Sequence, residues 1–62
     1  MSIENILAEN SLIFGEMSGK VMNGATYFEV ARQYRSFGEK IGVGDLGLMT
    51  YIAEYIKRKQ KD

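Results

Sequence analysis

The chain contains neither cysteine nor histidine, and this absence limits how a sequence of 62 residues can be held in a fold. A domain of this size buries only about 60% of the surface that its unfolded chain exposes, so its core is small. Small domains usually add disulfides, a bound metal or a second subunit. Disulfides are excluded here, and zinc, copper and haem sites lack their usual ligands. We therefore expect one domain over residues 1–62 without a metal or other cofactor, stabilised as a homo-oligomer, most simply a two-fold dimer.

Three segments repeat their apolar residues with the period of an α-helix. The apolar stripes comprise Ile3, Ile6, Leu7, Ile13, Phe14 and Met17 in the first segment, Tyr27, Val30, Ala31, Tyr34 and Phe37 in the second, and Leu48, Ile52, Tyr55 and Ile56 in the third. Leu12 points away from the first stripe. These patterns predict a compact all-α domain of three helices, over about residues 2–18, 26–37 and 46–60, joined by short connections.

Residues that favour helix ends support these boundaries. Ser2 is a favourable N-cap for the first predicted helix. Thr26 and Glu29 have the S/T-x-x-E spacing of a capping box, which predicts the start of the second helix. We expect Gly38 to end the second helix and Asp45 to cap the third.

The first connection leaves an alternative fold open. Asn23-Gly24 is the strongest short signal for a β-hairpin, so the alternative is an α+β domain with strands near residues 11–16 and 20–31. Strand alternation would place Arg32 on the same face as apolar residues, whereas the helical spacing does not. The sequence therefore favours the helical fold over the hairpin.

The second connection contains GVGDLG, residues 42–47, a literal G-x-G-x-x-G. In a dinucleotide-binding fold this pattern follows a buried strand, and an acidic residue lies about 20 positions further on. Here a predicted helix precedes it, and only 15 residues follow Gly47. Asp45 would also place a carboxylate where the phosphate should lie. We interpret the stretch as a joint between two helices and expect no nucleotide cofactor.

Catalytic groups are scarce in this composition. Without histidine or cysteine, acid–base or nucleophilic catalysis has to use carboxylates, serines, tyrosines or lysines with perturbed pKa values in a pocket. A three-helix chain of this length hardly encloses such a pocket. The nearest acidic pairs, Glu4 with Glu9 and Glu39 with Asp45, do not have the i, i+3 or i+4 spacing that shares a helix face. We therefore expect that the protein is not an enzyme.

The charges balance overall but are unevenly placed. Residues 1–31 carry a net charge of minus three, and residues 32–62 carry plus three. A basic cluster lies at the end of the third predicted helix and consists of Lys57, Arg58, Lys59 and Lys61. Such cations offset the helix dipole, and they also suit an alternative function in nucleic-acid binding. The start of that helix, residues 46–50, lacks the Arg, Asn and Gln side chains that read bases, which disfavours sequence-specific binding.

The third predicted helix has an unusually wide apolar arc. Eight side chains between Leu46 and Ile56 sweep roughly 220°, where a core-facing helix needs little more than about 100°. One margin holds Tyr51 and Tyr55, with Arg58 one turn further on, and Met49 lies at the other margin. These four residues are the predicted partner-binding residues. The alternative is that the helix is central to the fold and that both tyrosines cover the protein's own core.

Asn10 interrupts the apolar stripe of the first predicted helix. Such a side chain is either bonded to a neighbouring backbone group or buried at a helix interface, where it fixes register and subunit number. Both interpretations remain open from the sequence.

The expected location follows from hydropathy. No apolar run approaches the roughly 20 residues that cross a bilayer, and the first residues are acidic rather than basic, unlike a secretory signal. We expect a cytoplasmic protein without membrane contact. Four tyrosines and four methionines suit protein interfaces. By exclusion, the sequence predicts a small non-catalytic protein–protein interaction module: an adaptor, an inhibitor or a regulatory subunit.

Overall fold

The computed structural model describes residues 2–61, and all of its regular structure is helical. The helices are α1 (Ile3–Glu9), α2 (Ser11–Met22), α3 (Tyr27–Gln33), α4 (Arg35–Lys40) and α5 (Asp45–Gln60). The all-α prediction is confirmed at this level, but the described chain has five helices and not three. The alternative with a hairpin is wrong, because no strand occurs among residues 2–61.

Two single-residue breaks divide the first and second predicted helices. Asn10 has φ −122° and ψ 32°, and Tyr34 has φ −108° and ψ 27°, both outside helical values. The next helix begins at once in each case, because the amides of Phe14 and Gly38 donate to the carbonyls of the N-cap residues Asn10 and Tyr34, each at 3.0 Å. At the first break the Asn10 side-chain amide also donates to the Ile6 carbonyl at 2.9 Å, an interaction that bends helices. At each break one helix ends and the next begins at the same residue, so the chain changes direction there.

Asn23-Gly24 ends α2. Gly24 has φ 111°, a conformation that residues with a Cβ rarely adopt. The amide of Ala25 donates to the Lys20 carbonyl and that of Gly24 to the Val21 carbonyl, both at 3.0 Å. This pair of bonds is a Schellman motif, which satisfies the last carbonyls of a helix. The glycine that resembled a hairpin turn is thus a helix C-cap.

The same motif ends α4 at Gly42, which has φ 85°. The amide of Val43 donates to the Gly38 carbonyl at 2.9 Å, and that of Gly42 donates to the Glu39 carbonyl at 3.1 Å. The prediction that Gly38 ends a helix is wrong, because Gly38 is buried inside α4. A Cβ at Gly38 would lie 3.3 Å from the Leu48 side chain, so this glycine permits close packing of α4 on α5.

Two predicted N-caps are confirmed. The Ser2 hydroxyl accepts a hydrogen bond from the Asn5 amide at 3.3 Å at the start of α1. At α3, the Thr26 hydroxyl accepts from the Glu29 amide at 3.0 Å, and the Glu29 carboxylate accepts from the Thr26 amide at 2.9 Å. Both halves of the capping box are therefore formed.

The predicted cap at Asp45 is wrong. Gly44 is the N-cap of α5, and Asp45 is the first residue inside the helix. The Asp45 carboxylate instead accepts two hydrogen bonds from the Arg35 guanidinium, at 2.7 and 3.2 Å. This bidentate ion pair lowers the pKa of Asp45 and joins the start of α4 to the start of α5. The carboxylate thus links α4 to α5 and does not cap α5.

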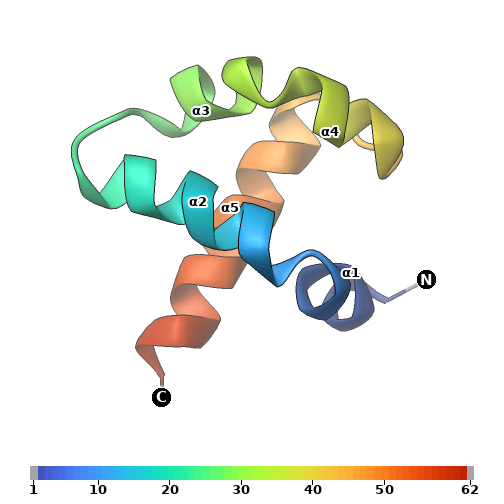
Figure 1. Ribbon diagram of the computed structural model, residues 1–62, viewed down its shortest axis with the longest axis horizontal. Coiled ribbons are helices and arrows are strands. Elements are labelled where there is room, and N and C mark those ends of the chain that lie inside the picture. Colours follow the sequence, from blue (N-terminus) through green and yellow to red (C-terminus); the bar gives the residue numbers. More distant parts are fainter. Residues whose placement is uncertain (1, 62) are drawn as a thin grey trace.

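The core forms around α5, which packs against each of the other four helices. In Figure 1, α5 begins near α4, passes behind α2 and runs toward the C-terminus. The buried apolar residues are Ile6, Leu7, Phe14, Met17, Val30, Ala31, Leu48 and Ile52. All eight fall within the predicted stripes. The wide apolar arc of the third predicted helix is therefore largely used inside the protein, although Leu46 and Ala53 remain exposed.

Candidate protein-binding groove

A groove of about 240 Å³ lies between α1 and the C-terminal half of α5. It is lined by Glu4, Leu7, Ala8, Ser11, Tyr55, Arg58 and Lys59. Leu7, Ala8 and the ring of Tyr55 supply apolar surface, and the charged residues supply a polar rim. The volume lies below the roughly 300 Å³ at which pockets for drug-sized ligands begin, and it suits one side chain of a protein partner.

Tyr55 is held firmly at this groove. Its ring stacks on that of Phe14, with centroids 5.9 Å apart and planes inclined by 23°. Its hydroxyl donates to the Ser11 carbonyl at 3.4 Å, which links α5 to the start of α2. A ring fixed on one side by the core presents a preorganised surface, so binding there loses little side-chain entropy.

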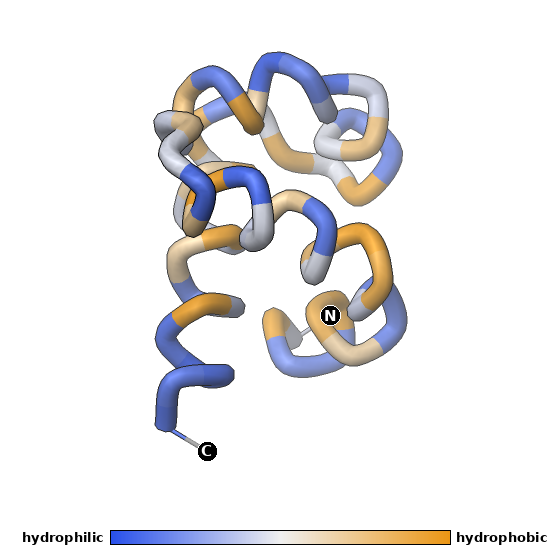
Figure 2. The backbone as a smooth tube through the Cα atoms, turned by 60° about the vertical axis from the view of Figure 1, so that its left-hand side comes forward, coloured by the Kyte–Doolittle hydropathy of each residue, from blue (hydrophilic) through white to orange (hydrophobic). Residues whose placement is uncertain are grey.

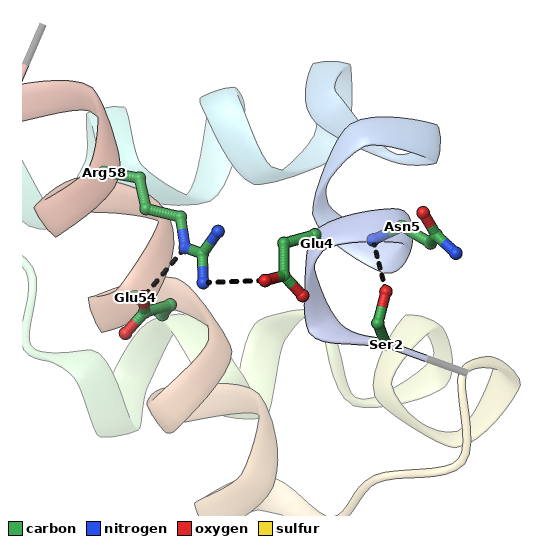
Figure 3. A network of polar contacts seen from close by, with 5 residues as sticks. All are labelled: Ser2, Glu4, Asn5, Glu54 and Arg58. Carbon is green, nitrogen blue, oxygen red and sulfur yellow. Dashed lines mark hydrogen bonds and ion pairs between the residues drawn. The ribbon is translucent and has the colours of Figure 1, made fainter.

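Arg58 bridges the two helices of the groove. Its Nε donates to the Glu54 carboxylate at 2.7 Å, and its Nη2 lies 3.8 Å from the Glu4 carboxylate. Figure 3 shows the guanidinium between Glu54 on α5 and Glu4 on α1. The hydrogen bond from Arg58 lowers the pKa of Glu54. The short contact orients Arg58, whereas the longer contact to Glu4 leaves room for exchange with another carboxylate.

Lys59 lies between this groove and a second hollow. Its Nζ is 5.6 Å from the centroid of the Tyr55 ring, within the range of a cation–π contact. The second hollow, of about 150 Å³, is lined by Ser18, Met22, Ile56, Lys59 and Gln60 between α2 and α5. The C-terminal half of α5 therefore has a hollow on each side, and Lys59 borders both.

The structure brings together two of the four predicted partner-binding residues. Tyr55 and Arg58 line the groove, whereas Tyr51 and Met49 line neither hollow. Tyr51 stacks on Phe14 with centroids 6.4 Å apart, and Met49 is partly buried against the core. Both tyrosines thus cover the core and stay partly exposed, and Tyr55 also lines the groove.

The α1 side of the groove was not predicted. Glu4, Ala8 and Ser11 belong to no recognisable motif, and the sequence identifies Leu7 only as part of the apolar stripe. The i, i+4 spacing of Glu4 and Ala8 shows that they share a face of α1, but not which helix lies opposite. Asn10 follows the first of its two interpretations, because its side chain bonds the Ile6 carbonyl of the preceding turn.

The predicted basic cluster lies on the last turns of α5, where Figure 2 shows a hydrophilic end of the chain. Lys57, Arg58, Lys59 and Lys61 are all exposed there. Arg58 is paired with two carboxylates and Lys59 lies over the Tyr55 ring. Two of the four cations therefore already interact with groups of the protein itself.

The outer glycines of the G-x-G-x-x-G stretch have structural roles, Gly42 through its positive φ and Gly47 through close packing. Gly42 ends α4, and a Cβ at Gly47 would lie 2.9 Å from the Cβ of Val43. Between them, Asp45 pairs with Arg35. Within residues 2–61 no three acidic side chains gather as metal ligands, and no helix is both long and apolar enough to cross a membrane. Comparison with protein-family models, with curated proteins and with solved structures found no match for this chain.

Proposed function

We propose that the protein is a small non-catalytic interaction module that binds another protein through the groove between α1 and α5. The observation that carries this proposal is the composition of the groove: the ring of Tyr55 and the exposed Ala8 lie beside the nearly buried Leu7, with Arg58, Lys59 and Glu4 around them. Tyrosine and arginine are enriched among the residues that dominate binding energy at protein interfaces. The groove is thus suited to an apolar anchor from a partner.

The contacts within the groove suggest how binding proceeds. An apolar side chain of the partner packs on Leu7 and Tyr55, and the stacking on Phe14 keeps the Tyr55 ring in place. Arg58 is oriented by Glu54 at 2.7 Å, so a partner carboxylate can replace the more distant Glu4 without loss of that orientation. Charged pairs at the rim chiefly govern specificity and association rate.

This arrangement fits an inhibitor, adaptor or regulatory subunit, because such proteins act by occupying a surface of the partner. The competing function is nucleic-acid binding by the basic end of α5. It has less support, because Arg58 already pairs with Glu54 and Glu4. Binding through phosphates would weaken steeply as salt is raised, whereas binding at an apolar groove would persist.

The proposal is tested by blocking the groove with Ala8→Arg. Ala8 is exposed on α1 and lines the groove, so the larger side chain fills the groove without entering the core. Ala53→Arg is the matched control, since Ala53 is also exposed on a helix but lines neither hollow. Each immobilised variant is exposed to extract of the source cells, and each retained protein is then purified and its affinity measured by calorimetry.

We expect the wild type and Ala53→Arg to bind the same protein with equal affinity, and Ala8→Arg to bind it at least about tenfold more weakly, as for loss of one anchor. Equal binding by Ala8→Arg would contradict the proposal. Retention of nucleic acid alone, lost at moderate salt, would instead favour the competing function.

A further inference from the structure

Leu12 is the most exposed of the large apolar side chains identified on the surface, at 87%. It is the second residue of α2 and directly follows Ser11, which lines the groove. Of the other exposed apolar residues, Phe28 lies beneath Arg32 at 5.5 Å, Met22 borders the second hollow, and Leu46 lines neither hollow. Leu12 is therefore an apolar projection beside the groove.

The charges around Leu12 are opposite to those around the groove. Glu9 lies three residues before Leu12 and Glu16 four residues after it, and both are exposed. Glu16 is a neighbour of Leu12 on the surface of α2, and Glu9 is the last residue of α1, on the other side of the break at Asn10. On the α5 wall of the groove, Arg58 and Lys59 are basic. Glu4 on the α1 wall is acidic, so the groove lining carries a net charge of plus one, and the acidic residues near Leu12 complement it.

The groove also has the size that Leu12 needs. A volume of about 240 Å³ corresponds to that of about eight water molecules, enough for the four carbon atoms of a leucine side chain. Leu7, Ala8 and Tyr55 supply the apolar surface against which those atoms would pack. Burial of an exposed leucine is favourable because it removes apolar surface from water.

From these observations we infer that the occupant of the groove is Leu12 of a second copy of this chain. The inference rests on the proposed function, since it names the partner of the same groove. Leu12 and the groove are adjacent on one protomer, so a two-fold axis forms two equivalent contacts at once, each Leu12 entering the groove of the other copy. The acidic residues beside Leu12 then face Arg58 and Lys59 of the opposite protomer.

Sedimentation equilibrium on single variants tests the inference. Leu12→Ser removes the apolar projection, Ala8→Arg blocks the groove, and Leu46→Ser is the control, because Leu46 is also exposed, at 78%, and lines neither hollow. We expect the dimer dissociation constant to rise by about 100-fold or more for the first two variants, about tenfold for each of the two contacts. The control should be unchanged, and circular dichroism should show every variant folded.

A mixture provides the sharper test. Dimers of Ala8→Arg have both grooves blocked, and dimers of Leu12→Ser lack both projections. A mixed dimer keeps one intact contact, so mixing the two variants should restore association that neither shows alone. If mixing restores nothing, or if Leu12→Ser dimerises like the wild type, the inference is wrong. A monomeric wild type whose groove binds a different protein would overturn the inference and leave the proposed function standing.

Discussion

Tyr55 stacks on Phe14, with ring centroids 5.9 Å apart, and the same tyrosine lines the groove between α1 and α5. Core and candidate binding site therefore share a side chain. Tyr51 also stacks on Phe14, at 6.4 Å, but lines neither hollow. The two tyrosines, one helical turn apart, allow the contributions to stability and to binding to be separated.

Tyr51→Ala and Tyr55→Ala should both lower stability, each by about 2 kcal/mol, because each removes an aromatic contact and partly buried surface. Only Tyr55→Ala should also weaken association per folded molecule. Thermal melting and sedimentation of both variants provide the measurement. Equal loss of association in the two variants would argue against a site specific to the groove.

Tyr55→Phe isolates the hydroxyl. It keeps the stacking on Phe14 and removes only the 3.4 Å hydrogen bond to the Ser11 carbonyl. The expected loss of stability is below about 1 kcal/mol, as for an exposed hydrogen bond, measured by urea denaturation. A loss as large as that of Tyr55→Ala would mean that the hydroxyl, and not the ring, holds this part of the groove.

Gly24→Ala and Gly19→Ala should change stability in opposite directions. Gly24 has φ 111°, so alanine there forces a left-handed conformation and should cost about 1–2 kcal/mol. Gly19 lies inside α2 with no atom within 4 Å of an added Cβ, so alanine should stabilise by about 0.5–1 kcal/mol. Thermal melting checks both. Stabilisation by Gly24→Ala would show that the Schellman turn does not form in solution.

Phe14→Ala should leave the chain largely unfolded. Phe14 is fully buried, and three aromatic rings contact it, those of Phe37, Tyr51 and Tyr55. The expected cost of about 3–5 kcal/mol equals the whole stability that a core of this size supplies. Circular dichroism at room temperature is the measurement, with Phe14→Leu as the milder comparison. A cooperative, native-like melt for Phe14→Ala would be incompatible with this packing.

Asp45→Asn should lower stability at neutral pH and have no effect in strong acid. The hydrogen bonds from Arg35 lower the pKa of Asp45 in the folded protein below its ordinary value of 3.8. A lowered folded-state pKa gives stability that is fully present above the ordinary value and lost as the pH falls through the folded value. Urea midpoints of the wild type and the variant should therefore converge as the pH falls below 3.8 and through the lowered pKa of Asp45. A difference that stays constant with pH would contradict the ion pair.

The apolar stripes could be predicted because burial imposes the helical period directly, so Phe14, Met17, Val30 and Leu48 were identified as core. The breaks at Asn10 and Tyr34 could not, because a single residue outside helical values does not interrupt the apolar stripe. Apolar spacing therefore predicts one long helix where the backbone forms two shorter ones.

Contacts between residues far apart in the sequence explain the other differences between the predicted and the observed structure. Asp45 is a good N-cap by composition, but Arg35, ten residues earlier, lies close enough to take its carboxylate. The groove likewise depends on α1 meeting the end of α5, some 50 positions apart in the chain, and no local pattern encodes that meeting. Arg58 and Tyr55 were identified from one helix face, whereas Glu4 and Ala8 required the tertiary structure.

The central place of α5 has a consequence for biosynthesis. The ribosome delivers α1 to α4 first, and these helices lack the one element that packs against all four of them until the 16 residues of α5 follow. At about 5–20 residues per second, those residues take about one to three seconds to be added. The core can therefore be completed only after α5 has been made, and until then part of the future core stays exposed on the nascent chain.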